Sequence, residues 1–431
     1  MKRSFWVLIL LLAGGPAVSS ASARTLIVHC GTLIFDTTRP PMTNADVVIV
    51  DGRVTEVGHD LKAPAGADRL DLSGETVMPG VIDAHSHMYT GPMGEGIPSV
   101  PLQVLRAAPG MTYALRSGIV AIRVLGTAGF IDVALRDAID EGTLEGPHII
   151  PAAHALTIPG GHGDFNPMPP EMLMTDYYTP LNGFVNSPAD AEKAVHLQIK
   201  YGARVIKLLA SGGVASPLDS PTAEQLSPEE MRVAVEQAHM DHIKVAAHAE
   251  NTNTIHDALA AGVDSIEHGA GLDQAEADYM KAHGIFLVPT LHVVDSIVHV
   301  KPEYHYPAYM IRKGQALAKI HFPSFRLALA TGVKMATGND GFYHPGSATV
   351  LDEIVTDVKY GMTPQQALTA ATRGGAELLG LPELGTIAVG KEGDLLAVQG
   401  DPLTDIGAIK HTRAVVYQGR IIVNHVTGET R

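Results

Sequence analysis

Residues 77–89 read VMPGVIDAHSHMY, an apolar run containing Val81 and Ile82 that is followed by two histidines one residue apart. Alternate side chains of an extended strand point to the same face, so His85 and His87 project together and can bind one metal ion. The chain contains 21 histidines in 431 residues, so one such pair carries little weight alone. Its meaning depends on whether other parts of the chain supply further ligands.

The composition is that of a globular enzyme with a sizeable core. The sequence is 45% hydrophobic and 18% charged, and its length fits one large domain and a smaller one. The formal net charge of −15 argues against nucleic acid or an anionic membrane as a partner.

The first 23 residues have the pattern of a secretory signal peptide. Lys2 and Arg3 form a basic start, FWVLILLLAGG over residues 5–15 is an apolar core, and Ala21–Ala23 resemble a cleavage site. The apolar run is too short to span a bilayer. We expect cleavage near Ala23–Arg24, a periplasmic or secreted mature protein, and no stable membrane anchor.

Two outer segments have the pattern of β-strands. Residues 24–78 contain short alternating runs separated by Asp-Gly and Ser-Gly turn signals, and residues 385–431 repeat this style. We expect these segments to combine into a small β-sandwich domain.

Residues 79–384 instead alternate short apolar strands with helical stretches, as parallel α/β proteins do. The candidate strands lie around Ile82 and over residues 118–126, 147–154, 204–210, 244–250, 264–269, 284–291 and 332–340. Eight such units predict a (β/α)8 TIM barrel, whose chemistry lies at the carboxyl ends of its strands.

Polar residues end or interrupt these apolar strands, where an unpaired charge would be costly. They are His85, His87, Lys207, His248, His268 and Asp340. Imidazoles and a carboxylate suit zinc and similar divalent ions. Burial lowers the pKa of a lysine, and a neutral Lys207 amine can capture carbon dioxide to form a carbamate (N6-carboxylysine) that bridges two metals. Asp340 can then move a proton from the attacking water to the leaving amine.

The chain resembles the amidohydrolase superfamily, in the branch of imidazolonepropionase-like and prolidase-like metal-dependent hydrolases. The resemblance rests on motifs along nearly the whole mature chain: MPGVIDAHSHMY, IKLLASGGVASP, QLSPEEM, AAHAE, AGVDSIEHG and LGTIAVGKEGDLLAVQGDPLTDI. It implies two divalent ions, with zinc expected. His85, His87 and Asp340 would hold one ion, His248 and His268 the other, and carboxylated Lys207 would bridge them.

Three residues are candidates for substrate contact. His162, in the glycine-rich TIPGGHGD, resembles a family histidine that hydrogen-bonds the scissile carbonyl oxygen, and a solvated loop histidine is its alternative reading. His292 follows the seventh strand. Glu250 stands two places after His248, where many relatives carry an aromatic residue or histidine.

We therefore expect a binuclear amidohydrolase that uses a metal-bridging hydroxide. Its substrates would be small molecules, namely dipeptides or N-acyl amino acids, as in Xaa-Pro dipeptidases or carboxypeptidases. One alternative is a mononuclear cyclic amide hydrolase or deaminase of the imidazolonepropionase type, which needs no bridging lysine. Another is a non-catalytic scaffold, which the complete ligand set disfavours. The sequence leaves open whether the chain forms a homo-oligomer.

Overall fold

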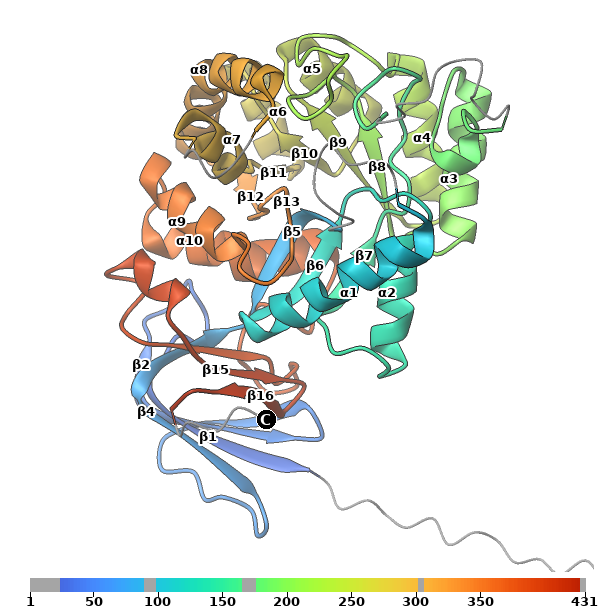
Figure 1. The fold of residues 1–431 in the computed structure, drawn as a ribbon. Coiled ribbons are helices and arrows are strands. Elements are labelled where there is room, and N and C mark those ends of the chain that lie inside the picture. Colours follow the sequence, from blue (N-terminus) through green and yellow to red (C-terminus); the bar gives the residue numbers. More distant parts are fainter. Residues whose placement is uncertain (1–23, 89–97, 165–175, 301–305, 427–431) are drawn as a thin grey trace, which may run out of the picture.

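The computed structural model describes residues 24–88, 98–164, 176–300 and 306–426. The expected signal peptide, residues 1–23, lies outside the described residues. Figure 1 shows a barrel of strands surrounded by helices, with a β-rich domain below it that contains both ends of the described chain.

Eight parallel strands form the barrel wall. They are β5 (Val81–His87), β6 (Ile119–Val124), β7 (His148–Pro151), β8 (Val205–Leu209), β9 (Lys244–Ala249), β10 (Ser265–His268), β11 (Phe286–Val288) and β12 (Lys334–Met335). Every residue of β6 and of β8 is buried, as expected for strands with the barrel interior on one side and helices on the other. The predicted barrel is confirmed.

Two irregular stretches close the barrel. Leu156, beyond β7, donates its backbone N–H to the carbonyl of Lys207 in β8. Ala84 in β5 donates to the carbonyl of Thr337, and Asp340 donates to the carbonyl of His85. The short β13 (Gly341–Phe342) then pairs with the end of β5. The eighth predicted strand, residues 332–340, is regular only over β12, and the stretch ends at Asp340, whose backbone is left-handed with φ 49°.

Helices cover the outside of the barrel. They are α1 (Val100–Arg116), α2 (Ile131–Asp140), α3 (Pro188–Lys200), α4 (Pro228–Met240), α5 (Thr252–Ala261), α6 (Gln274–His283), α7 (Leu291–Val298), α8 (Ala308–Thr331), α9 (Val350–Tyr360), α10 (Pro364–Thr369) and α11 (Gly375–Leu379). Single turns are η2 (Pro180–Asn182), the π-helical η4 (Ala370–Gly374) and η5 (Ile406–Lys410).

Local sequence signals explain where several helices begin. Ser227 caps α4, accepting a hydrogen bond from the backbone of Glu230 while the Glu230 side chain accepts one from the backbone of Ser227. The same reciprocal pair forms at α6 between Asp273 and Glu276. Among the described residues, no helix is both long and apolar enough to cross a bilayer.

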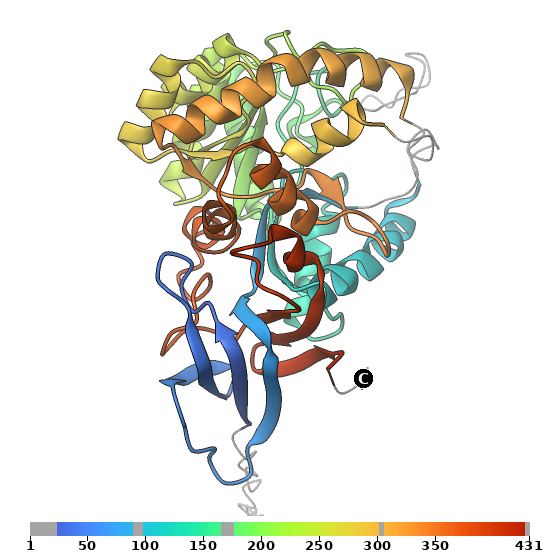
Figure 2. The same cartoon turned by 90° about the vertical axis from the view of Figure 1, so that its left-hand side faces the viewer.

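The small domain consists of one continuous sheet of seven strands, in the order β16-β15-β14-β4-β1-β2-β3. The strands are β1 (Thr25–Leu33), β2 (Met42–Val50), β3 (Arg53–Gly58), β4 (Asp68–Pro79), β14 (Leu395–Val398), β15 (Thr412–Tyr417) and β16 (Arg420–Asn424). Arg53 in β3 bridges back to Glu392, just before β14, so the sheet curls over a shared core. β4 continues almost directly into the first barrel strand (Figure 2).

Candidate metal centre

Three predicted ligands meet at the mouth of the barrel, where β5 ends. The Nε2 atoms of His85 and His87 lie 3.2 Å and 3.1 Å from the same oxygen, Asp340 Oδ1. His85 is 1% exposed, so this meeting point is screened from bulk water on its side. The alternation of β5 therefore produces the shared histidine face that the sequence predicts.

Each of these imidazoles also donates a hydrogen bond from its Nδ1. His85 Nδ1 is 2.8 Å from Glu267 Oε2 and, because a carboxylate only accepts, this nitrogen donates. His87 Nδ1 is 3.2 Å from the carbonyl oxygen of Gly126 and also donates. Both Nε2 atoms lie within hydrogen-bond distance of Asp340 Oδ1, so a proton or a cation must separate each nitrogen from this oxygen. Three electron-pair donors that converge in this way fit a divalent cation.

A second group of donors lies beside the first. His248 Nε2 donates to the carbonyl of Gly212 at 3.0 Å, which leaves Nδ1 with its lone pair. His268 is placed between the groups, with its ring centroid 5.0 Å from that of His85 and 4.5 Å from that of His248. Burial lowers the pKa of His248 and of His268 well below the usual range, which keeps both imidazoles neutral and able to bind metal.

Glu250 lies inside this second group rather than at the rim. It is 4% exposed, and its Oε2 is 3.9 Å from His248 Nε2 and has no hydrogen-bond partner among the described residues. Ligand atoms of His248, Glu250 and His268 lie within 4.8 Å of one another, as do those of His85, His268 and Asp340. The described residues thus offer two adjacent positions for a cation, with His268 common to both.

Lys207 is buried in the middle of β8, with 2% of its surface exposed. Burial lowers its pKa to about 8, although Glu267 and Asp340 act in the opposite direction. An appreciable share of the amine is therefore neutral near neutral pH.

A buried ion pair that sequence reasoning missed orients His85. Arg123 Nη2 donates to Glu267 Oε1 at 2.8 Å, and Glu267 Oε2 accepts from His85. Burial by itself would raise the pKa of Glu267, but the Arg123 charge and the His85 hydrogen bond lower it to about 2. Carboxylates behind a ligand histidine fix its tautomer and ring orientation. In the sequence, this pair is indicated only by a charged residue within each of two apolar strands, Arg123 in β6 and Glu267 in β10.

A second buried acid fixes the approach of Asp340. Asp83 Oδ1 accepts from the backbone N–H groups of His85 and Asn339, and Asp83 Oδ2 accepts from the Tyr343 hydroxyl at 2.6 Å. The strand that carries the histidines is thereby tied to the turn that carries Asp340. Asp340 itself has a left-handed backbone, a strained conformation of the kind that is concentrated at functional sites.

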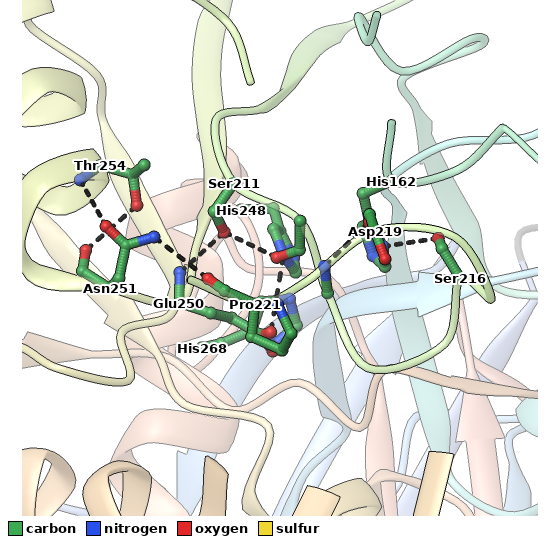
Figure 3. A network of polar contacts seen from close by, with 12 residues as sticks. His162, Ser211, Ser216, Asp219, Pro221, His248, Glu250, Asn251, Thr254 and His268 are labelled. Carbon is green, nitrogen blue, oxygen red and sulfur yellow. Dashed lines mark hydrogen bonds and ion pairs between the residues drawn. The ribbon is translucent and has the colours of Figure 1, made fainter. Parts of the chain in front are cut away.

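His162 lies against the second group of donors, as Figure 3 shows. Its ring stacks on His248 with 4.3 Å between centroids. Its Nδ1 is 2.8 Å from Ser216 Oγ and 3.5 Å from Asp219 Oδ2. A Cβ at Gly213 would lie 2.3 Å from the His162 ring, so this close approach requires glycine. His162 is thus a placed side chain, and not a solvated loop histidine.

His292 is the remaining candidate. It is the second residue of α7, and its backbone N–H donates to Glu353 Oε2. Its Nδ1 is 3.2 Å from Thr356 Oγ1, so the structure places this ring between α7 and α9.

Comparisons with known proteins agree with this architecture. The model of the amidohydrolase family matches residues 76–422. Ochratoxinase of Aspergillus niger is 33% identical over 420 residues, which cover 93% of this chain and 86% of the fungal protein. A solved Xaa-Pro dipeptidase with bound methionine superposes with a TM-score of 0.85 at 31% identity, over 92% of this chain and 99% of its own. A prolidase in complex with N-methylphosphonate-L-proline has the same TM-score and identity, over 93% of this chain and 100% of its own.

Proposed function

The chain belongs to the amidohydrolase family and is a metal-dependent hydrolase of amide bonds, and from this premise we propose that it releases α-amino acids from dipeptides or N-acyl amino acids. The observation that carries the proposal is the convergence of His85, His87 and Asp340 beside His248 and His268. The substrate class is supported by relatives named as dipeptidase and prolidase, which match over almost the whole chain.

We assign two divalent ions to this centre, with zinc as the expected metal. His85, His87 and Asp340 would hold one, and His248 and His268 the other. The Lys207 amine would combine with carbon dioxide, releasing a proton, and the resulting carbamate would help to hold both ions. Divalent ions in such a centre lower the pKa of water and polarise a carbonyl group.

Side chains of this chain perform the remaining steps. An Asp340 carboxylate oxygen accepts a proton from the attacking water and delivers it to the leaving nitrogen. Ser216 Oγ accepts from the backbone N–H of Gly163 and donates to Nδ1 of His162, so the ring is fixed beside His248 with its proton on Nε2, from which it can donate to the oxygen of the scissile carbonyl as negative charge develops.

We further propose that Glu250 shapes the substrate preference. Burial raises the pKa of Glu250 well above its ordinary value, so bound cations would be needed to hold it as a carboxylate; in that form it would disfavour acidic side chains by like-charge repulsion. We expect proline and neutral or aromatic leaving groups first, and arginine or lysine close behind. We also propose that residues 1–23 direct export, a proposal supported by their basic start and apolar core. Sequencing the amino terminus of the secreted protein tests it.

The central experiment combines metal analysis with a substrate panel. The mature protein, loaded with zinc, is assayed on Xaa-Pro, Xaa-Phe, Xaa-Arg and Xaa-Glu dipeptides and on the matching N-acyl amino acids, beside Glu250→Gln. Two ions at the barrel mouth with activity on this panel support the proposal. One ion at the barrel mouth with turnover only of cyclic amides would favour the imidazolonepropionase-type alternative. An unchanged charge profile in Glu250→Gln would remove that residue from substrate selection.

A further inference from the structure

A second cluster of possible ligands lies at the opposite end of the barrel, where it meets the small domain. His148 is the first residue of β7, and Glu392 and Asp394 come just before β14. Their ligand atoms lie within 4.8 Å of one another. The amino ends of barrel strands serve stability rather than catalysis in this architecture, so the cluster is separate from the metal centre.

One carboxylate oxygen in this cluster lacks a hydrogen-bond partner among the described residues. Asp394 is 5% exposed; its Oδ1 accepts from the backbone N–H of Gln418 at 2.7 Å, but its buried Oδ2 has no hydrogen-bond partner among the described residues. A buried carboxylate oxygen without a partner is costly, and native proteins usually explain such an atom by a water or an ion.

The neighbouring groups add negative charge. Glu392 Oε2 lies 3.0 Å from His148 Nε2, and Asp140 also acts on this histidine. The charge of Arg53 lowers the pKa of Glu392, but its guanidinium is paired with Glu383 at 2.8 Å. The cluster therefore has two carboxylates for one imidazole. Burial raises the pKa of Asp394 to about 7, and the charge of Glu392 acts in the same direction.

We propose that His148 Nε2, Glu392 and Asp394 Oδ2 form a structural site for a zinc-type divalent ion that ties the barrel to the small domain. One imidazole and two carboxylates, with water completing the shell, are a donor set that such ions accept. Binding displaces the proton on His148 Nε2, so affinity falls as the pH is lowered. His148 and Glu392 have side chains that are 27% and 20% exposed, which gives the ion a route from solvent.

The test uses the full mature protein. Crystals grown with micromolar zinc are measured above and below the zinc absorption edge. Zinc per chain is also measured for the wild type, Asp394→Asn and Glu392→Gln, with Glu383→Gln as a matched control carboxylate at the same junction. The ions of the barrel mouth are common to all four proteins, so differences report only on the proposed site, whatever the enzyme cleaves.

We expect an anomalous peak bounded by His148, Glu392 and Asp394. We also expect one zinc fewer per chain in Asp394→Asn and Glu392→Gln than in the wild type and Glu383→Gln, and a zinc-dependent rise in Tm that these two variants lack. Equal zinc in all four proteins, or a peak that needs millimolar zinc, would overturn the proposal in favour of a proton-sharing acid cluster. If the variants do not fold, the wild-type crystal decides the question.

Discussion

Arg123 provides the strongest test of how this barrel interior is held together. Its guanidinium is 3% exposed at the side chain and donates to Ala84 O, to Ser265 Oγ at 3.1 Å and to Glu267 Oε1 at 2.8 Å. Arg123→Met keeps most of the side-chain volume but removes the cation. Glu267, with no exposed surface, then remains as a buried carboxylate without its charged partner.

Two routes give similar magnitudes for the cost of this change. Removing one partner of a buried ion pair costs about 3–5 kcal/mol. The pKa of Glu267 falls from 4.5 to about 2 in the folded protein, which at 1.36 kcal/mol per unit corresponds to about 3 kcal/mol shared by all its partners. We expect a loss of roughly 3 kcal/mol, or about 1 M in the urea midpoint if the denaturant slope is near 3 kcal/mol per M.

The assay is urea unfolding of the mature protein at several pH values, with Arg116→Met as the control. Arg116 pairs with Glu145 at the surface, with side chains 44% and 38% exposed, and should cost less than about 1 kcal/mol. The folded pKa of Glu267 lies below its ordinary 4.5, so its contribution is complete above pH 4.5 and is lost as the pH falls toward 2. The gap between wild type and Arg123→Met should therefore narrow below pH 4.5. The reasoning would be refuted if Arg123→Met unfolded at the same urea concentration as the wild type. It would also be refuted if Arg116→Met lost as much unfolding free energy as Arg123→Met.

Four further changes test the centre itself. Lys207→Ala should lose metal and roughly 100-fold or more in kcat/KM, with partial recovery on adding a short carboxylic acid, and normal turnover with two ions would contradict the bridge. His162→Asn should lower kcat more than it raises KM, because its hydrogen bond strengthens as the oxyanion forms; a change in KM alone would leave only a positioning role. Gly213→Ala should displace the His162 ring and lower kcat at unchanged metal content, as kinetics and metal analysis together will show. Tyr343→Phe should lower the free energy of unfolding by about 1–3 kcal/mol, because Asp83 loses a hydrogen-bond donor. Burial raises the pKa of Asp83 to about 7, so the stability that comes from the neutral acid is lost as the pH rises through 7. Thermal unfolding should therefore show a larger drop in Tm from wild type to variant at pH 8 than at pH 5.

Much of the barrel and its ligands could be predicted because each ligand follows an apolar strand. His85 and His87 share a face through strand alternation, and the carboxyl ends of parallel strands meet at one mouth. The capped start of α4 at Ser227 is equally local. Such features depend on neighbours in the sequence, which a single chain displays directly.

Long-range pairings could not be predicted in this way. Arg123 meets Glu267 across the barrel, 144 residues away, and nothing near either residue specifies the other. Asp83 also accepts from the backbone N–H of Asn339, beside the left-handed residue Asp340 and 256 positions later in the chain. The His292 ring is positioned by hydrogen bonds with Glu353 and Thr356, which lie on α9 more than 60 residues further along the chain.

The order of strands in the small domain has a consequence for biosynthesis. β4 pairs with β14 through Pro79 and Leu395, so a ribosome must deliver almost the whole chain before this strand gains its second neighbour. Until then the β4 edge of the β4-β1-β2-β3 sheet is unpaired and its apolar face is uncovered. A nascent chain released before β14 would keep this unpaired strand edge beside a nearly complete barrel. Chaperones and proteases act on chains with such exposed edges. The small domain is therefore completed only when the last strands have been synthesised and β14 has paired with β4.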